Sequence, residues 1–393
     1  MGIRVGVFFG GRSVEHEVSI ISAIQAINAF DASKYDVTPV YCARDGSMYV
    51  GERVARIEEY RDIPLLVKRS KRVVCVRDAG RFTLSYYPAR RLGSSFHAEI
   101  DVAFPIVHGT NVEDGALQGF FRTLGVPFVG PDVTASAVGM DKYVQKVVFR
   151  DNGIPVLDCC RVFVKDYFAD ADAAVGEIER AVGYPAIVKP ANLGSSIGIK
   201  VAQDARALRE ALDYAFQYSD TALAERAVQN LREINCAVLG DQESAEASEC
   251  EEPISADEML TYEDKYVSGE KGGAKGMGSA RRVLPADIPQ ETREKVRGLA
   301  LKAFRALCCA GVARLDFLMD ASSGEVWLNE INTIPGSLSF YLWEPVGLPY
   351  RDLLDRLVSL ALKRSREDAA IDYSFETNIL TNLRPGNLKA AKR

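Results

Sequence analysis

The sequence predicts a protein of mixed α/β and α+β class that begins with a parallel-sheet domain. Strand-like and helix-like segments alternate from the start of the chain, which is typical of strands joined by crossover helices. Later segments include two neighbouring strands separated by a short polar turn, which indicates an antiparallel hairpin. The chain has 393 residues, of which 47% are apolar, enough for two to three packed domains of about 150 residues each.

Residues 1–133 are expected to form the N-terminal α/β domain. The run Ile3 to Phe9 is rich in β-branched and aromatic residues and ends at Gly10-Gly11, so it predicts a strand followed by a turn. Isoleucines at positions 20, 24 and 27 recur at helical spacing behind that turn. Ligands of such sheets bind at the carboxyl ends of the strands. Further strands are expected at 36–42, 101–107 and 127–130, and a helix at 116–124.

Two further domains and a tail are expected after residue 133. Residues 134–225 are expected to form a central α+β lobe, residues 226–364 a C-terminal lobe and residues 365–393 a polar tail. The central lobe is predicted to hold a helix through Asp141-Lys142 that ends at Asn152-Gly153, a helix near 170–182, strands at 186–190 and 197–201, and a helix at 205–216. The C-terminal lobe is predicted to hold a strand at 234–239, an acidic stretch at 243–258, a glycine-rich stretch at 268–278, a helix near 290–309, a hairpin at 313–332 and a helix that ends near 364.

The charge and cysteine content exclude several classes of function. Lys and Arg number 48 and Asp and Glu 54, for a net charge of −6, which argues against nucleic acid and against an anionic membrane as partners. No apolar run reaches the roughly 18 residues of a membrane span. Eight cysteines without a C-x-x-C pair, together with three histidines, argue against a zinc site and a disulfide framework. We therefore expect a cytoplasmic protein with a small-molecule substrate.

The hairpin at 313–332 carries a candidate metal site. Side chains alternate between the faces of a strand, so Arg314 and Asp316 share a face, as do Glu330 and Asn332. If the register aligns the two pairs, their oxygens form a donor set that suits Mg²⁺ bound to substrate phosphates. The alternative is a solvated strand face with an Arg–Asp salt bridge, and the hairpin alone does not separate the two.

Lysines and glycine-rich loops point to phosphate binding. Lys189 lies at a strand end before a loop of small residues, 190–198, whose N–H groups suit phosphate oxygens. This loop lacks the Walker pattern, and the turn at Gly10-Gly11 lacks a dinucleotide fingerprint, so a nicotinamide or flavin cofactor is not supported. The stretch 268–278 fits either a lid over a phosphate donor or an ordinary surface loop.

Seven motifs in order carry a resemblance to a known family. The chain resembles the D-alanine–D-alanine ligases of the ATP-grasp superfamily over about residues 1–362. The motifs are Gly10-Gly11-x-Ser13 to Ser19, His108-Gly109 to Gln118-Gly119, Met140-Asp141-Lys142, Lys189-Pro190 to Ser196, Lys265-Tyr266, Arg314-x-Asp316, and Asn329-Glu330-Ile331-Asn332-Thr333-x-Pro335-Gly336.

The resemblance implies a two-lobed ATP-grasp fold behind the N-terminal domain and an ATP-dependent ligase of peptidoglycan precursor synthesis. ATP would phosphorylate the carboxylate of a first D-alanine, and the amine of a second would displace the phosphate. Lys142, Lys189, Lys265 and Ser195 would bind the ATP phosphates, and Glu225, Val228 and Glu233 would line the adenine and ribose pocket. Asp316, Glu330 and Asn332 would bind two Mg²⁺ ions, with Mn²⁺ as an alternative.

The resemblance also implies the substrate-binding residues and a cytoplasmic homodimer. Arg314 and the backbone N–H of Gly336 would stabilise the oxyanion. Glu15 would hold the ammonium group of the first D-alanine in a hydrogen-bonded set with Ser196 and Tyr266. Val18 and His108 would lie near this set, and Tyr341 and Leu342 would lie near the second substrate.

The segment after Gly336 departs from the family pattern. Tyr341 occupies the position where many relatives have a small hydroxyl for the carboxylate of the second substrate. Either the tyrosine turns into the core and Ser337 or Ser339 takes that carboxylate, which we favour, or the phenol donates the bond itself. The acceptor therefore stays open between D-alanine, D-serine, D-lactate and another D-amino acid. Two hypotheses of a different kind are an inactive nucleotide-binding homologue and an ATP-grasp carboxylase.

Overall fold

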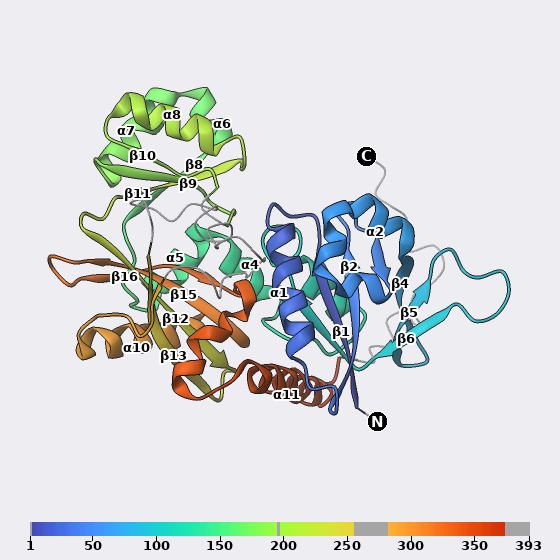
Figure 1. The fold of residues 1–393 in the computed structure, drawn as a ribbon. Helices are drawn as coiled ribbons and strands as arrows, with labels where there is room; N and C mark the ends of the chain where they lie inside the picture. Colours follow the sequence, from blue (N-terminus) through green and yellow to red (C-terminus); the bar gives the residue numbers. More distant parts are fainter. Residues whose placement is uncertain (1, 195–196, 255–281, 374–393) are drawn as a thin grey trace, which may run out of the picture.

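A computed structural model describes residues 2–194, 197–254 and 282–373 of the chain. The described residues form a seven-stranded, a four-stranded and a five-stranded sheet, each covered by helices (Figure 1). The predicted class, α/β and α+β with parallel strands in the N-terminal domain, is confirmed. None of the helices within these ranges combines the length and apolar character that a membrane span requires.

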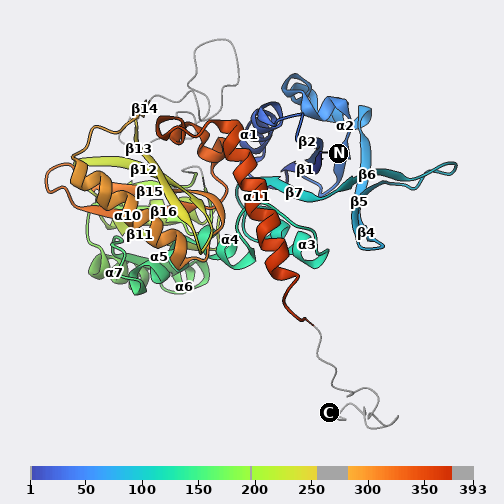
Figure 2. The ribbon, with the colours of Figure 1, turned by 90° about the horizontal axis from the view of Figure 1, so that it is seen from below.

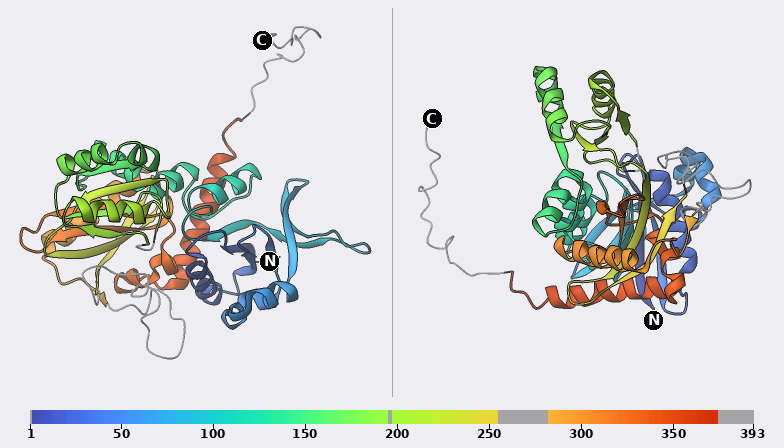
Figure 3. Two further views of the ribbon diagram at one scale, coloured as in Figure 1. Left: turned by 90° about the horizontal axis from the view of Figure 1, so that it is seen from above. Right: turned by 90° about the vertical axis from the view of Figure 1, so that its left-hand side faces the viewer.

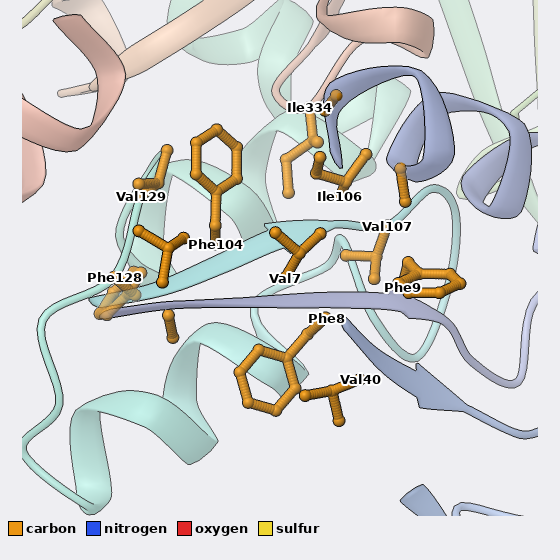
Figure 4. Packing of buried hydrophobic residues seen from close by; sticks show 14 of the residues in the cluster. Val7, Phe8, Phe9, Val40, Phe104, Ile106, Val107, Phe128, Val129 and Ile334 are labelled. Carbon is orange, nitrogen blue, oxygen red and sulfur yellow. The ribbon is translucent and has the colours of Figure 1, made fainter. Parts of the chain in front are cut away.

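The centre of the N-terminal domain is a group of parallel strands. β1 (Ile3–Gly10) lies between β2 (Tyr35–Cys42) and β7 (Val102–Ile106) and is parallel to both. Buried aliphatic and aromatic side chains cover both faces of β1, as Figure 4 shows for Val7, Phe8 and Phe9. The flanking helices are α1 (His16–Ala29) and α3 (Ala116–Thr123).

The same sheet continues beyond β2 in antiparallel strands that the sequence did not predict. The sheet order is β6-β5-β4-β3-β2-β1-β7. The added strands are β3 (Met48–Val50), β4 (Lys71–Asp78), β5 (Arg81–Tyr86) and β6 (Phe96–Ile100), with η1 (Glu52–Ala55), η2 (Ile57–Asp62) and α2 (Ile63–Arg69) between β3 and β4. The extension lies away from the other lobes (Figure 3).

The central lobe is an antiparallel sheet with its helices on the outer side. The strand order is β10-β9-β11-β8, and α6, α7 and α8 form the outer layer (Figures 1 and 3). The elements are β8 (Cys159–Phe163), α6 (Val164–Ala169), α7 (Ala171–Ala181), β9 (Ala186–Pro190), β10 (Lys200–Ala202), α8 (Ala205–Ala215) and β11 (Thr221–Arg226).

The prediction of one helix through Asp141-Lys142 is wrong, because two helices meet there. α4 (Val133–Met140) ends before Asp141, and α5 (Lys142–Asp151) begins after it. The Asp141 carboxylate accepts the backbone N–H groups of Tyr143 and Val144, so it caps α5. The break gives Lys142 the first position of a helix.

The C-terminal lobe is a five-stranded antiparallel sheet of order β14-β13-β12-β15-β16. The acidic stretch from Glu243 supplies one of its strands, β13. The elements are β12 (Leu231–Gly240), β13 (Ala245–Pro253), β14 (Arg282–Val283), α10 (Gln290–Ala306), β15 (Gly311–Asp320), β16 (Val326–Asn332), η4 (Gly336–Leu342), η5 (Glu344–Val346) and α11 (Tyr350–Asp368).

Helix α11 packs against both the N-terminal domain and the C-terminal lobe. α11 lies along the junction of the N-terminal domain and the C-terminal lobe (Figure 2). Its leucines 353, 354 and 357 belong to the same buried cluster as Val5 and Phe104. Residues 365–368, expected in the polar tail, form the last turn of this helix. The domain boundaries at 133, 225 and 364 stay predictions.

Candidate active site

The β15–β16 hairpin brings the four predicted polar residues together. Arg314 pairs with Asn332, and Asp316 pairs with Glu330, so the register is the one that a metal site requires. Opposed residues in a sheet have Cβ atoms about 5 Å apart, and two opposed carboxylates repel unless a cation lies near them. The pair Asp316 and Glu330 therefore favours a cation on this face.

A bulge in β16 adds a further polar residue to this face. Phe317 pairs with Leu328 and Asp316 with Glu330, so Asn329 has no partner in the register. Because one extra residue shifts the alternation, Asn329 and Glu330 both face a pocket while Leu328 lies in the core. The Lys189 ammonium donates to Asn329 Oδ1 at 3.0 Å. Strand alternation alone could not find this contact.

Arg314 and Asp316 form a bidentate pair beside Asn332. Arg314 Nε and Nη2 lie 2.7 and 2.8 Å from the two Asp316 oxygens, and Asn332 Nδ2 lies 2.9 Å from Asp316 Oδ2. Burial by itself lowers the pKa of Arg314, but the Asp316 charge and hydrogen bonds outweigh it and raise the pKa well above its ordinary value. The salt bridge expected in the alternative interpretation exists, but on a largely buried face rather than a solvated one.

Three side chains on this face could hold a divalent cation. The described residues contain no group of three or more His, Cys, Asp or Glu side chains arranged for a metal. The predicted set differs, because it combines the Asp316 and Glu330 carboxylates with the Asn332 amide oxygen, all hard donors. Mg²⁺ commonly takes one or two carboxylates and completes its shell with phosphate oxygens and water, so these residues fit such an ion.

Lysines and carboxylates line the neighbouring pocket, and the buried Lys146 lies behind them against Glu225. Lys189 Nζ lies 2.6 Å from Glu225 Oε2, and Lys146 Nζ lies 2.8 Å from Glu225 Oε1. Lys142 Nζ lies 2.9 Å from Glu330 Oε2 and donates to the Leu193 carbonyl. The Lys146 contact is an ion pair without hydrogen-bond geometry.

The charges in this pocket shift one another's ionisation. Burial lowers the pKa of Lys189. Burial alone would raise the pKa of the Glu225 carboxyl, but the charges of Lys146 and Lys189 outweigh burial and lower that pKa. Lys146 was not predicted from the sequence. Its spacing of four residues from Lys142 places both on one face of α5, and that spacing was the available signal.

This pocket lies between the central and C-terminal sheets. Lysines, carboxylates and apolar side chains all contribute to its lining. Its lining includes the predicted residues Lys142, Lys189, Glu225, Val228, Glu233, Asp316 and Glu330, together with Leu157, Ile187, Leu231, Phe317 and Leu318. A lining that combines apolar side chains with lysines suits a flat base joined to phosphates.

A second, more polar pocket adjoins the first. Both are lined by Lys142, Gly194 and Glu330, so they meet at these residues. The second is also lined by Glu15, His108, Glu113, Arg314, Asn332 and Gly336. The Glu15 carboxylate is crowded by backbone, because a Cβ atom on Gly194 would fall 2.6 Å from one of its oxygens. A side chain at position 194 would therefore displace the end of the Glu15 side chain.

Several predicted site residues either lie outside the described residues or line neither pocket. Ser195, Ser196, Lys265, Tyr266 and the stretch 268–278 lie outside the described residues, so the predicted set of Glu15, Ser196 and Tyr266 stays a prediction. Val18 and Leu342 are buried and belong to the lining of neither pocket.

Tyr341 lies in the core beside a charged pair. Its ring is part of the hydrophobic cluster, as the favoured alternative expects. Its hydroxyl donates to Glu251 Oε1 at 3.1 Å, and the Arg282 guanidinium lies 3.7 Å from the ring centre. Neither alternative included Glu251. The role expected for Ser337 or Ser339 at a carboxylate stays a prediction.

Comparisons with known proteins agree along most of the chain. Residues 4–131 match the family model described as D-ala D-ala ligase N-terminus, and residues 148–359 match the one described as D-ala D-ala ligase C-terminus. The D-alanine–D-alanine ligase of Acetivibrio thermocellus is 38% identical over 376 residues, covering 93% of this chain and 97% of the relative. D-alanine–D-alanine ligase A of Chromobacterium violaceum is 40% identical, covering 95% and 99%.

Solved structures show the same similarity. The D-alanine–D-alanine ligase from Coxiella burnetii has a TM-score of 0.77 at 30% identity, covering 94% of this chain and 96% of that one. The VanG D-Ala:D-Ser ligase from Enterococcus faecalis has a TM-score of 0.75 at 30% identity, covering 92% and 100%.

Proposed function

Since this chain belongs to the D-alanine–D-alanine ligase family, we propose that it joins two D-alanine molecules, with conversion of ATP to ADP and phosphate. The observation that carries the proposal is the meeting of two pockets at Lys142, Gly194 and Glu330. One pocket has the lysines and apolar side chains of a nucleotide site, and the other has Glu15 and Arg314. A phosphoryl group could therefore pass between them without leaving the protein.

The nucleotide pocket suits ATP with its phosphates toward the lysines. Lys142 and Lys189 would bind phosphate oxygens as cations, with Ser195 and Lys265 as further predicted contacts. Glu225, Val228 and Glu233 would face the adenine and ribose. Phosphates compete with Glu225 and Glu330 for these lysines, so binding ATP exchanges one set of ion pairs for another.

The metal would be held by Asp316, Glu330 and Asn332. Two bound Mg²⁺ or Mn²⁺ ions would neutralise charge that develops on the transferred phosphoryl group. Glu330, released from Lys142, would be free to act as a ligand. Asp316 keeps Arg314 close to the same site.

The substrate pocket suits an amino acid that is first activated and then attacked. Glu15 would hold the ammonium group of the first D-alanine, with Ser196 and Tyr266 as predicted partners. The carboxylate of that D-alanine takes the phosphoryl group, and the amine of the second D-alanine then attacks the acyl carbon and expels phosphate. Arg314 and the Gly336 N–H would stabilise the negative oxygen of that tetrahedral intermediate.

The product is a precursor for peptidoglycan, and we propose a cytoplasmic homodimer as the working form. D-serine, D-lactate and other D-amino acids are the alternative acceptors, because Tyr341 stands where many relatives have a small hydroxyl. An inactive nucleotide-binding homologue is the alternative of another class.

The test is phosphate release from ATP with D-alanine paired with D-alanine, D-serine or D-lactate, and with the product identified by mass. We expect D-alanyl-D-alanine as the main product at neutral pH. Preferred formation of a D-Ala-D-Ser or D-Ala-D-lactate product would show that D-serine or D-lactate, and not D-alanine, is the acceptor. The absence of ATP turnover with every pair would contradict the ligase function.

A further inference from the structure

The Glu113 carboxylate connects the N-terminal domain to the strand end that carries the active site. It is buried in the loop that follows β7, and its two oxygens serve different parts of the fold. Glu113 Oε2 accepts the Gly109 N–H at 2.9 Å. Glu113 Oε1 accepts the Ile334 N–H at 2.9 Å and the Thr333 hydroxyl at 3.2 Å. One carboxylate therefore fixes the backbone just before Gly336.

His108 binds the carbonyl group of the same residue, Ile334. Its Nδ1 lies 2.8 Å from the Ile334 carbonyl oxygen, and its Nε2 lies 3.1 Å from the Ser22 hydroxyl. A carbonyl only accepts, so Nδ1 carries the proton and Nε2 accepts from Ser22. Burial lowers the pKa of His108 to about 4, so this neutral form holds at pH 7. Both ring nitrogens are thus committed within the protein.

Helix α1 completes the set from a third direction. The Ser22 hydroxyl oxygen accepts the Ser337 N–H at 2.8 Å, and the Ser337 hydroxyl donates to Gln25 Oε1 at 2.7 Å. Gly336 therefore lies between two anchored residues, Ile334 and Ser337.

The anchored segment needs such support because its backbone is strained. Ser337, Leu338 and Ser339 have φ angles of 52°, 52° and 48°, a left-handed conformation that is unfavourable for residues other than glycine. Such strain persists only where the surroundings fix it, and it gathers at functional sites. The bonds from Glu113, His108 and Ser22 are the contacts that fix it from the N-terminal domain.

We propose that Glu113 is a positioning residue for ligation. Together with His108 and Ser22, it holds the segment 333–337 so that the Gly336 N–H points toward the oxyanion. The inference rests on the proposed function, which places that N–H at the tetrahedral intermediate. Glu113 acts through the segment 333–337, and a misplacement of about 1 Å in such a donor lowers the rate about 100-fold. Glu113 does not line the nucleotide pocket, so we expect its replacement to change ATP binding little.

The test is Glu113→Gln, which keeps the shape but replaces one acceptor oxygen by a donor. Either orientation of the amide sets its NH₂ against the Gly109 or the Ile334 N–H. We expect kcat to fall at least 10-fold, the KM for ATP to change less than twofold, and the Ile334 amide hydrogen to exchange at least 10-fold faster. Ser22→Ala removes the opposite anchor and should act in the same direction, so the inference stays testable if Glu113→Gln folds poorly.

The matched control is Asp31→Asn, a buried carboxylate of the same domain that binds Ser33 and Arg351 away from the pocket. It should keep kcat and Ile334 exchange even if it lowers stability. An unchanged kcat or unchanged Ile334 exchange in both Glu113→Gln and Ser22→Ala would overturn the positioning role. A wild-type protein that turns over no ATP refutes the proposed function instead, and the exchange measurement still reports on the anchoring contacts.

Discussion

Replacing Tyr341 by phenylalanine separates a role in stability from a role in acceptor binding. The change removes only the hydroxyl, which donates to Glu251 Oε1 at 3.1 Å in the core. The ring and its contact with Arg282 remain. The structure therefore predicts an effect on folding and little effect on the second substrate.

The size of the effect follows from the partners that Glu251 keeps. A hydrogen bond to a charged group contributes about 1.5–3 kcal/mol. Glu251 retains Arg282 at 3.0 Å and Asn235 at 3.2 Å, so it is not left without donors. We expect the free energy of unfolding to fall by about 1.5 kcal/mol, at the lower end of that range.

Tyr350→Phe is the matched control in the neighbouring segment. Its ring stacks on Phe340 at 4.4 Å, and its buried hydroxyl has no hydrogen-bond partner among the described residues. Removing that hydroxyl should leave stability unchanged or raise it slightly, because burying an unsatisfied polar group is unfavourable. The comparison isolates the bond to Glu251 from the general cost of a Tyr-to-Phe change.

The assay is urea unfolding of both variants together with saturation kinetics for the second D-alanine. A rise of tenfold or more in the acceptor KM of Tyr341→Phe, with unchanged unfolding, would refute this reasoning. The phenol would then bind the acceptor carboxylate directly.

Three further predictions concern the ionisable side chains Glu330, Lys146 and His108. Glu330→Gln should lower phosphate release at least 100-fold with unchanged urea unfolding, because a neutral amide is a poor ligand for Mg²⁺; near-normal turnover in a folded variant would remove Glu330 from the metal site. Lys146→Met leaves the buried Glu225 with one lysine, so the free energy of unfolding should fall by about 3 kcal/mol. The KM for ATP should rise as well, and an unchanged KM would show that Lys146 does not affect the nucleotide pocket through Glu225. His108 has a pKa of about 4 in the fold and about 6.5 unfolded, so the unfolded chain takes up the proton first and the contribution of this group to stability is lost as pH falls from 6.5 to 4, by about 3 kcal/mol in all. Burial raises the pKa of Glu113 to about 7, which favours the fold as pH falls, so the test is a difference between proteins: unfolding at pH 7 and 4.5 should show that the wild type loses more stability than His108→Gln.

The sequence predicts the parts of the fold that depend on local patterns. The apolar run of β1 and the turn at Gly10 indicate a buried strand and its end, because few other structures suit such a run. The β15–β16 hairpin, though not its pairing beyond Phe317, follows from two alternating runs on either side of a polar turn. These features need only residues that are close along the chain.

Other features depend on distant parts of the chain, so no local pattern indicates them. Strand β4 is largely exposed and charged, and it is a strand only because it has partners in the sheet. The bulge at Asn329 adds one residue between two regular pairings. The bond from Tyr341 to Glu251 spans 90 residues, and the anchoring of Ile334 by Glu113 spans 221.

The position of α11 has a consequence for synthesis on the ribosome. Strand β1 leaves the ribosome long before α11, but its buried cluster includes Leu353, Leu354 and Leu357 of that helix. A nascent chain that ends before residue 350 therefore exposes apolar surface that the finished protein covers. We expect fragments that stop at η5 to be captured by chaperones or to aggregate, and supplying α11 as a separate peptide to restore their solubility.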